Sequence, residues 1–501
     1  ASADHRNNTS NKSEYKLDVA RDWHAAFPLT VKVGAMVQPF NSKATNADTN
    51  TWTFRPTATA AERVVRNYNL IDPVFSSRAP DWAGGKVQWI SPVRTYELYK
   101  SRPDYFVLDE ATSYTNRVNG SRKLMETLTA GFARVDARLL DRRLWLVGGV
   151  RYEKTDDEGW GPLNDPTAQY FKDAQGRVIR NAAGQPTLIT TDPLQRAYLR
   201  YRERGTYNER SYSGYYPSLN ATYNLRDDLV ARFGFAETIG RPPIANIVPS
   251  VSLPDATATS GTIQVSNTGL KPWSARSYDL SLESYLLKGA TASISVFQKD
   301  VKGFFVSTVT PATPELLDFY GVVGGDAGGV YTIATTANGG NAQLRGIEIS
   351  YKQALTFLPS WARGLQVFAN WTRRTLTGQN KGDFSGFFPS NLSWGVNFTR
   401  ARFAAKFSST YREEIRGNVV AQSASIPAGT FQWSRASLSY QASVQCRLLP
   451  WLELYGTLVD FNDKNNLLGL RWYNPTTPEW ASDRQTLKTG PKATVGIRGE
   501  F

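Results

Sequence analysis

The chain carries few of the side chains on which enzyme chemistry depends. Among its 501 residues there are two histidines, His5 and His24, and a single cysteine, Cys446. A catalytic triad needs a histidine beside its nucleophile, and zinc sites are built mainly from His and Cys. No G-x-S-x-G nucleophile elbow occurs in the sequence. We therefore expect no enzyme activity, no metal site and no cofactor, and one cysteine excludes an intramolecular disulfide.

One stretch of the chain is rich in aromatic side chains that suit binding. It contains Trp82, Trp89, Tyr96 and Tyr99 within a long, irregular segment. Such rings can stack on a sugar or on an aromatic group of a small-molecule ligand. They can equally form the small core of a compact loop. The sequence leaves both interpretations open.

A second stretch, residues 196–216, interleaves arginines with tyrosines and reads RAYLRYRERGTYNERSYSGYY. In a soluble protein this pattern would suggest single-stranded nucleic acid. Here it leads from a long loop into a predicted strand, so we favour a salt-bridge cluster and expect no nucleic-acid partner. The functional alternative is that Arg200 and Arg202 contact an anionic ligand or the phosphates of lipopolysaccharide. The net charge of +14 allows either interpretation, since it suits an anionic membrane face as well as an anionic ligand.

The acidic run Asp156, Asp157 and Glu158, with Asp165 nearby, is the remaining candidate for cation chemistry. It lacks the alternating ligand positions of a calcium loop. We therefore interpret it as part of a solvated loop.

The elements that must position these segments are strands. In the last ten residues Ala493, Val495, Ile497 and Gly499 alternate with polar side chains, which is the period of a strand with one apolar face. About ten residues is the length that a tilted strand needs to cross a bilayer. The same alternation recurs along the chain, in segments that include 15–20, 31–37, 229–235, 278–283, 347–352, 392–398 and 438–448.

The connections between these segments alternate between two kinds. Short turns are predicted near 27–29, 141–143, 226–228, 288–290, 400–402 and 449–451, with a longer one at 356–364. Between the hairpins lie long irregular stretches at 41–122, 156–210, 240–274, 307–343, 413–434 and 462–490. Short turns at one rim and long loops at the other are typical of an outer-membrane barrel.

Hydropathy and charge fit the same architecture. The mean hydropathy is −0.41, and no run of about 18 apolar residues could form a spanning helix. Charged side chains such as Arg134, Asp136 and Arg138 share one strand face, and they would cost several kcal/mol if they faced lipid. The fold class expected is therefore an all-β transmembrane antiparallel barrel with a polar interior. We count about fifteen strands, and because single-chain barrels have an even number, we expect further strands upstream.

At this level of detail the sequence resembles the TonB-dependent receptor family of Gram-negative outer membranes. The resemblance extends from about Glu14 to the end of the chain, and four stretches in the family's order carry it. They are Tyr216–Pro249 (YPSLNATYNLRDDLVARFGFAETIGRPPIANIVP), Ser266–Tyr285 (SNTGLKPWSARSYDLSLESY), Leu344–Tyr351 (LRGIEISY) and Gly490–Phe501 (GPKATVGIRGEF).

The resemblance implies that residues 1–501 are the C-terminal part of a barrel of about 22 strands. It implies that an N-terminal plug domain, which contacts TonB, lies outside this chain. It further implies an outer-membrane receptor that imports a siderophore, cobalamin or an oligosaccharide. Its partners would then include outer-membrane lipid, lipopolysaccharide and the barrel-assembly machinery, for which Phe501 would be part of the signal. A passive porin-like channel and a secreted, soluble β-rich binding protein remain the alternatives.

Overall fold

The computed structural model describes most of the chain, with a few gaps at the long loops and termini. The described residues are 2–3, 6–24, 27–45, 50–57, 59, 62–77, 86–253, 260–320, 330–379, 388–420, 426–427, 429–461, 467–488 and 490–499.

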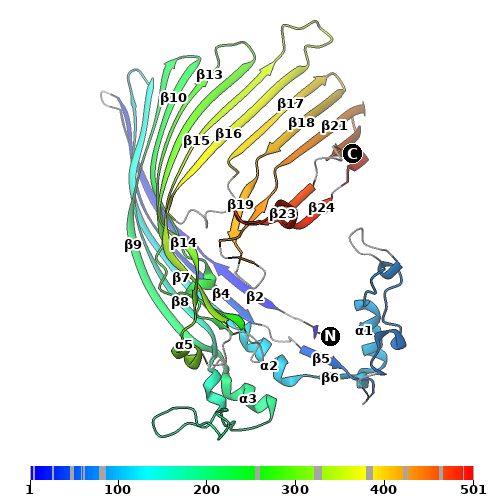
Figure 1. Ribbon diagram of the computed structural model, residues 1–501. Helices are drawn as coiled ribbons and strands as arrows, with labels where there is room; N and C mark the ends of the chain where they lie inside the picture. Colours follow the sequence, from blue (N-terminus) through cyan, green and yellow to red (C-terminus); the bar gives the residue numbers. More distant parts are fainter. Residues whose placement is uncertain are drawn as a thin grey trace.

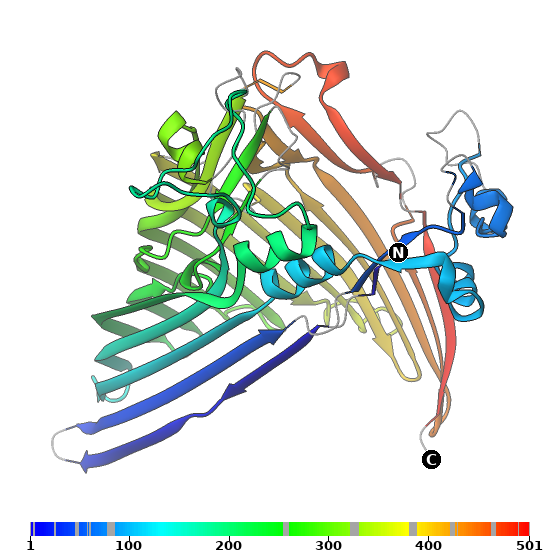
Figure 2. The same cartoon turned by 90° about the horizontal axis from the view of Figure 1, so that it is seen from below.

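Most of the described residues belong to one large, curved antiparallel sheet of barrel type, which we call the wall (Figures 1 and 2). Each strand pairs with the next in the order listed, so sequence neighbours are spatial neighbours along the whole wall. The described residues place fifteen strands in it: β3 (Tyr15–His24), β4 (Pro28–Thr45), β7 (Arg122–Leu139), β8 (Leu144–Asn164), β9 (Tyr201–Arg226), β10 (Leu229–Gly240), β13 (Trp273–Ser284), β14 (Ala290–Pro311), β15 (Val330–Ala354), β16 (Leu365–Gln379), β17 (Ser390–Arg400), β18 (Phe403–Arg412), β21 (Ser437–Leu449), β22 (Leu452–Val459) and β25 (Lys492–Gly499).

The predicted strand number and the antiparallel barrel-type sheet are thus confirmed. Among the described residues β3 pairs only with β4 along its length, and β25 pairs only with β22. These two strands form the edges of the wall, seen as the dark-blue and red strands at its opposite sides (Figure 2).

The register of the wall separates its two faces. Leu17, Ala35, Gly131, Tyr152 and Tyr215 are successive cross-strand partners and therefore point to the same side. We call this side the apolar face. The exposed apolar side chains on it run from the first strand to the last: Leu17, Val19, Val33, Val150, Phe233, Leu280, Leu282, Ile294, Val296, Ile349, Trp394, Val444, Leu454, Val495 and Ile497.

The residues between them form the polar face of the wall. Glu126, Asp157 and Arg210 are direct cross-strand partners on this side. Arg134 and Asp136 form an ion pair of 2.6 Å on the same face, as expected from the sequence. The predicted alternation is therefore confirmed, and these charged side chains lie on the side away from the apolar rows.

The short connections lie at one rim of the wall, and those within the described residues fall where the sequence predicts them. At the turn predicted near 27–29, β4 already begins at Pro28, and residues 25–26 lie outside the described residues. The turns occupy 140–143, 227–228, 285–289, 401–402 and 450–451, with the longer connection at 355–364. Leu140, Asp141 and Arg142 take left-handed φ values of 54°, 53° and 66° to reverse the chain between β7 and β8.

The long connections are shorter than the sequence suggests, because several strands extend beyond their apolar stretch. The connection predicted at 156–210 spans only 165–200 in the structure, and the one predicted at 307–343 spans only 312–329. The predicted boundaries were wrong here because the strand ends carry polar side chains on both faces, so that no alternation marks them. Backbone pairing holds them instead, as between Trp160 and Tyr207.

Several short strands lie at the long-loop rim. Strand β2 (Asn7–Lys12) pairs with the far end of β4, and β11 (Val251–Ser252) pairs with β12 (Ser260–Val265), which runs parallel to β15. A four-stranded sheet continues the order of the last wall strands through β19 (Ile415–Val419), β20 (Phe431–Ser434), β23 (Leu467–Tyr473) and β24 (Asp483–Lys488).

The helices belong to the long-loop connections (Figure 2). Between β4 and β7 the chain forms β5 (Asn50–Phe54), α1 (Pro92–Ser101), β6 (Phe106–Leu108) and α2 (Glu110–Asn119), and β5 also pairs with β1 (Ser2–Ala3). Helix α3 (Pro193–Arg200) precedes β9, α4 (Ile244–Ile247) follows β10, and α5 (Pro314–Phe319) follows β14. Within the described part of the chain no helix is both long and apolar enough to cross a membrane.

Candidate ligand-binding surface at the long-loop rim

The segment of residues 241–253, which we call the strap, leaves β10 and crosses the polar face of the wall. Ile247 and Val248 are each 1% exposed and pack against Leu124 and Phe40. Burial of each of these two side chains contributes about 1.5–3 kcal/mol. The strap is therefore held as a fixed layer on the wall.

Two glycines of β8 make room for the strap backbone. A Cβ atom on Gly161 would lie 1.9 Å from the carbonyl oxygen of Pro249, and one on Gly159 would lie 2.8 Å from that of Ile247. Both distances are shorter than van der Waals contact, so a side chain at either position would displace the strap.

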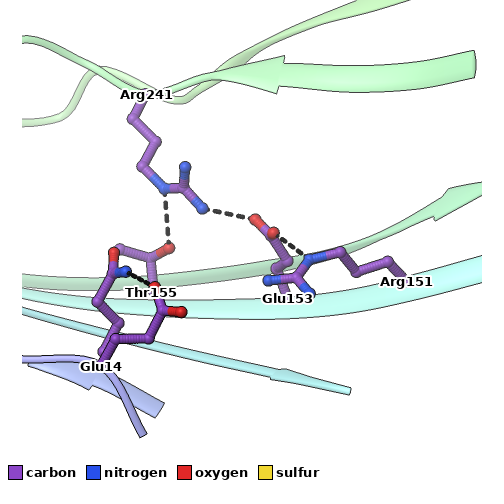
Figure 3. Close-up of polar contacts among 6 residues, drawn as sticks. Glu14, Arg151, Glu153, Thr155 and Arg241 are labelled. Carbon is purple, nitrogen blue, oxygen red and sulfur yellow. Dashed lines mark hydrogen bonds and ion pairs between the residues drawn. The ribbon is translucent and has the colours of Figure 1, made fainter. Parts of the chain in front are cut away.

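An arginine at the start of the strap ties it to the wall (Figure 3). Arg241 donates to the carboxylate of Glu153 at 2.5 Å and to the hydroxyl of Thr155 at 3.3 Å. The other carboxylate oxygen of Glu153 accepts from Arg151 at 2.5 Å. Glu153 is thus shared by two guanidinium groups. On β4, which β7 separates from β8, Gln38 donates to Glu14 at 2.7 Å.

A second ion pair lies deeper under the same connection. The side chain of Asp157 is fully buried and accepts from Arg210 at 2.9 Å, while Arg210 also donates to the backbone oxygen of Leu270 at 2.8 Å. Glu126 lies directly beside Asp157 across the strand pair. Because a buried carboxylate without a partner is strongly destabilising, Arg210 fixes both this part of the wall and the chain that returns into β13.

The strap, the strand ends and β12 enclose a cavity of about 720 Å³ at the long-loop rim, which we call the polar cavity. Its lining is mostly amides and hydroxyls, among them Asn119, Asn164, Asn246 and Gln264. Ser266 fixes one side of it, since its hydroxyl accepts from the backbone nitrogen of Ser250 at 2.7 Å.

The charges that line the polar cavity are all of one sign. Arg122, at the start of β7, and Arg200, at the end of α3, are its two charged residues, and no carboxylate lies among the described residues of the lining. Arg200 donates to Asn164 at 3.4 Å, and its Nε atom is buried without a hydrogen-bond partner. Arg122 has no side-chain hydrogen bond or ion pair within the described part of the chain.

The predicted aromatic candidates lie elsewhere, in the lobe formed by β5, α1 and β6. Tyr96 and Tyr99 line a second, apolar cavity of about 570 Å³. The ring of Tyr99 lies 5.6 Å from that of Trp52 and 5.5 Å from that of Phe106. Trp89 is half-exposed and does not line this cavity among the described residues. This packing fits the interpretation of the rings as the core of a compact lobe.

The other predicted residues divide between the polar cavity and the surface. Arg200 lines the cavity, whereas Arg202, two residues further on, is exposed and does not. Trp82 and Phe501 lie outside the described residues. The structure thus brings Tyr96 and Tyr99 together and places Arg200 apart from them.

Sequence reasoning missed Arg122, Arg241 and the pair Asp157–Arg210. Asp157 is not part of a solvated loop, since it lies within β8 and is buried against Arg210. Its two neighbours point to the apolar-face side, where Asp156 accepts from Lys154 at 2.8 Å. A strict period-two assignment extended past the apolar stretch would have separated the two aspartates.

Comparison with known proteins points to one family. A family model described as "TonB dependent receptor-like, beta-barrel" matches residues 1–498. A search of curated protein sequences finds no match.

Solved structures share the fold at low sequence identity. The ferric-catecholate import receptor Fiu from E. coli K12 aligns with a TM-score of 0.54 and 12% identity, over 98% of this chain and 55% of that one. The ferric enterobactin receptor PfeA from Pseudomonas aeruginosa gives 0.54 and 13%, over 99% and 55%. The siderophore receptor PiuA from Acinetobacter baumannii gives 0.53 and 9%, over 99% and 56%. The chain therefore spans about half the length of the solved structures that it matches.

Proposed function

The chain belongs to the TonB-dependent receptor family through its β-barrel, and from this premise we propose that it is the wall of an outer-membrane receptor that imports a nutrient ligand by TonB-coupled transport. One observation carries the proposal: the fifteen-strand sheet has a continuous apolar face and a charged opposite face. A sheet that lies between hydrocarbon and a wet or plugged interior needs both faces.

The extent of the apolar rows supports a membrane position. On β8 and β9 the apolar face ends in the ring pair Tyr152 and Tyr215, whose centroids are 5.1 Å apart. Further along β8, on the same face, lie the charged side chains of Lys154 and Asp156. An aromatic girdle followed by charges is typical of the interface between hydrocarbon and polar headgroups. Outer-membrane lipid and lipopolysaccharide are the partners that this face would meet.

The soluble alternative predicts a second sheet packed on the apolar rows. In the described residues these rows are exposed instead, with Val495 at 82% and Ile497 at 69% of their full accessible area. A soluble protein rarely leaves an apolar surface of this extent uncovered.

The ligand classes proposed are those of the family: a siderophore, cobalamin or an oligosaccharide. Among the structural relatives, Fiu is named as a ferric-catecholate import receptor, PfeA as a ferric enterobactin receptor and PiuA as a siderophore receptor. At their level of identity the likeness concerns the fold. The plug and the TonB-contacting segment would lie in the rest of the protein, and Phe501 would contribute to recognition by the barrel-assembly machinery.

Uptake measurements on the full-length protein test the proposal. Cells that express it would be supplied separately with a ferric siderophore, cobalamin and an oligosaccharide, each labelled, in strains with and without functional TonB. We expect accumulation of one ligand class that is lost without TonB. Equal accumulation in both strains would instead identify a passive channel.

A further inference from the structure

The polar cavity narrows the class of ligand. We propose that it binds an anionic, hydroxyl-rich ligand of a few sugar rings in size, and that Arg122 and Arg200 receive a carboxylate or phosphate group of that ligand. The inference rests on the proposed function, since it specifies what the receptor captures.

The positive charge at the polar cavity has no carboxylate to neutralise it among the described lining residues. Arg122 and Arg200 supply this charge. By contrast, Arg210 of the wall is paired with Asp157, and Arg241 of the strap is paired with Glu153. Two guanidinium groups that face one partly enclosed space attract an anion, and their planar donor sets match a carboxylate or a phosphate in bidentate geometry.

The two arginines also have free donors. The buried Nε of Arg200 has no hydrogen-bond partner, and Arg122 makes no side-chain hydrogen bond or ion pair among the described residues. Asn164 accepts from the remaining side of Arg200 at 3.4 Å and thereby holds its guanidinium at the cavity wall. Buried donors without partners are uncommon in folded proteins, so the polar groups around the Arg200 guanidinium leave its donors incompletely satisfied.

The rest of the lining matches hydroxyl groups. Asn119, Asn246 and Gln264 offer amides that both donate and accept hydrogen bonds, and serine and threonine hydroxyls lie between them. This lining disfavours a hydrophobic ligand. The volume of about 720 Å³ lies within the range of about 300–1,000 Å³ that is usual for small-molecule sites.

Calorimetric titration of the full-length protein in detergent tests this inference. The probes are trigalacturonate, the neutral trisaccharide maltotriose and inorganic phosphate. We expect at least one anionic probe to bind with a dissociation constant below about 10 mM. Maltotriose should bind at least about tenfold more weakly than that anion, because it lacks the group that the arginines receive.

Single substitutions identify the site. Arg122→Gln and Arg200→Gln should each weaken binding of the anion by about 10–100-fold, the range for loss of a charge-assisted hydrogen-bonding group. Arg122→Lys keeps the charge and should lose less than Arg122→Gln. The matched control is Arg226→Gln, which removes one positive charge at the opposite end of β9 and should leave binding unchanged. Heat-modified mobility on gels confirms that each variant is folded.

The titrations distinguish two chemical classes of anionic ligand, and they also show whether the inference itself fails. Tighter binding of trigalacturonate indicates an acidic glycan, and tighter binding of phosphate indicates a phosphorylated ligand such as a lipopolysaccharide headgroup. The inference is overturned if no anion binds, if maltotriose binds as well as trigalacturonate, or if folded Arg122→Gln and Arg200→Gln bind normally. These titrations need no TonB, so their result is independent of whether uptake depends on it.

Discussion

Adjacent residues of a wall strand have different environments, because their side chains point to opposite faces of the sheet. Asp156 pairs with Lys154 on one side, while Asp157 is buried against Arg210 on the other. The acidic run that looks like a cluster in the sequence is therefore no cluster in space. The two aspartates have separate cations on opposite faces, which leaves them in no geometry suited to a shared metal ion.

Gly161 gives a sharp test of the strap. Gly161→Ala should displace the strap, since the added Cβ would lie 1.9 Å from the carbonyl oxygen of Pro249. Amide hydrogen exchange in residues 244–248 should become at least about tenfold faster, which corresponds to a loss of about 1.4 kcal/mol in local stability. Mass spectrometry of peptides from this segment provides the measurement.

The control for this substitution is Gly131→Ala on β7. There the nearest heavy atom to a new Cβ is the carbonyl oxygen of Gly34 at 3.8 Å, an ordinary contact. Exchange in the strap should stay at the wild-type rate. If Gly161→Ala also leaves it unchanged, the strap does not rest on β8 as described.

Asp173 makes the hairpin between β8 and β9 sensitive to acid. Hydrogen bonds from the backbone nitrogen of Arg177, together with its guanidinium and the backbone of Gln175, hold the pKa of the Asp173 carboxyl below its usual value. Because the folded pKa is lowered, this contribution to stability is complete above the unfolded value of about 4 and is lost as the pH falls through the folded value.

A fluorescent label on Gln175→Cys, in a Cys446→Ala background, reports this change. Its anisotropy should be constant at neutral pH and fall below about pH 4 as the hairpin loosens. With Asp173→Asn added, the acid-dependent step should disappear. A step of the same size in that variant would assign the titration to another group.

At the scale of the strand, β14 shows how the two faces differ in what they tolerate. Val296 lies on the apolar face and is 45% exposed, whereas the adjacent Ser295 faces the polar side opposite Glu348. Val296→Arg should lower the free energy of unfolding by about 2–4 kcal/mol in lipid vesicles, the cost of a cation facing the bilayer midplane. Denaturant unfolding of the reconstituted full-length protein measures it.

Ser295→Arg is the matched partner of this change. The same side chain is added one residue earlier, and it gains Glu348 as a neighbour, so the free energy of unfolding should change by less than about 1 kcal/mol. Equal destabilisation by both substitutions would contradict the assignment of the apolar face to lipid.

For the whole molecule, the separation of turns and loops predicts an orientation. Long loops of an outer-membrane barrel face the outside and short turns face the periplasm. In the Cys446→Ala background, Gln175→Cys should react with a membrane-impermeant maleimide in intact cells. Asp227→Cys, at the short turn between β9 and β10, should react only after the outer membrane is opened. Labelling of Asp227→Cys in intact cells would reverse the orientation.

Much of the wall follows from sequence pattern alone. The rows that include Leu229, Phe233 and Val495 alternate strictly, because a membrane strand must show one side chain in two to hydrocarbon. The turns within the described residues were placed correctly for the same reason, since each lies where alternation stops. Beyond the hydrocarbon this constraint ends, and there the predicted boundaries at 156–210 and 307–343 were wrong.

The sequence by itself determined the fold class, the number of strands and the two faces, because period-two alternation is a local property that the bilayer imposes on each strand separately. Only the tertiary structure decided which residues form the candidate site. Arg122 and Arg200 are 78 positions apart in the numbering, and the strap that helps to enclose them comes from a third connection. Contacts between residues so far apart depend on how the long loops fold back onto the wall. No local pattern in the chain encodes this arrangement of the loops.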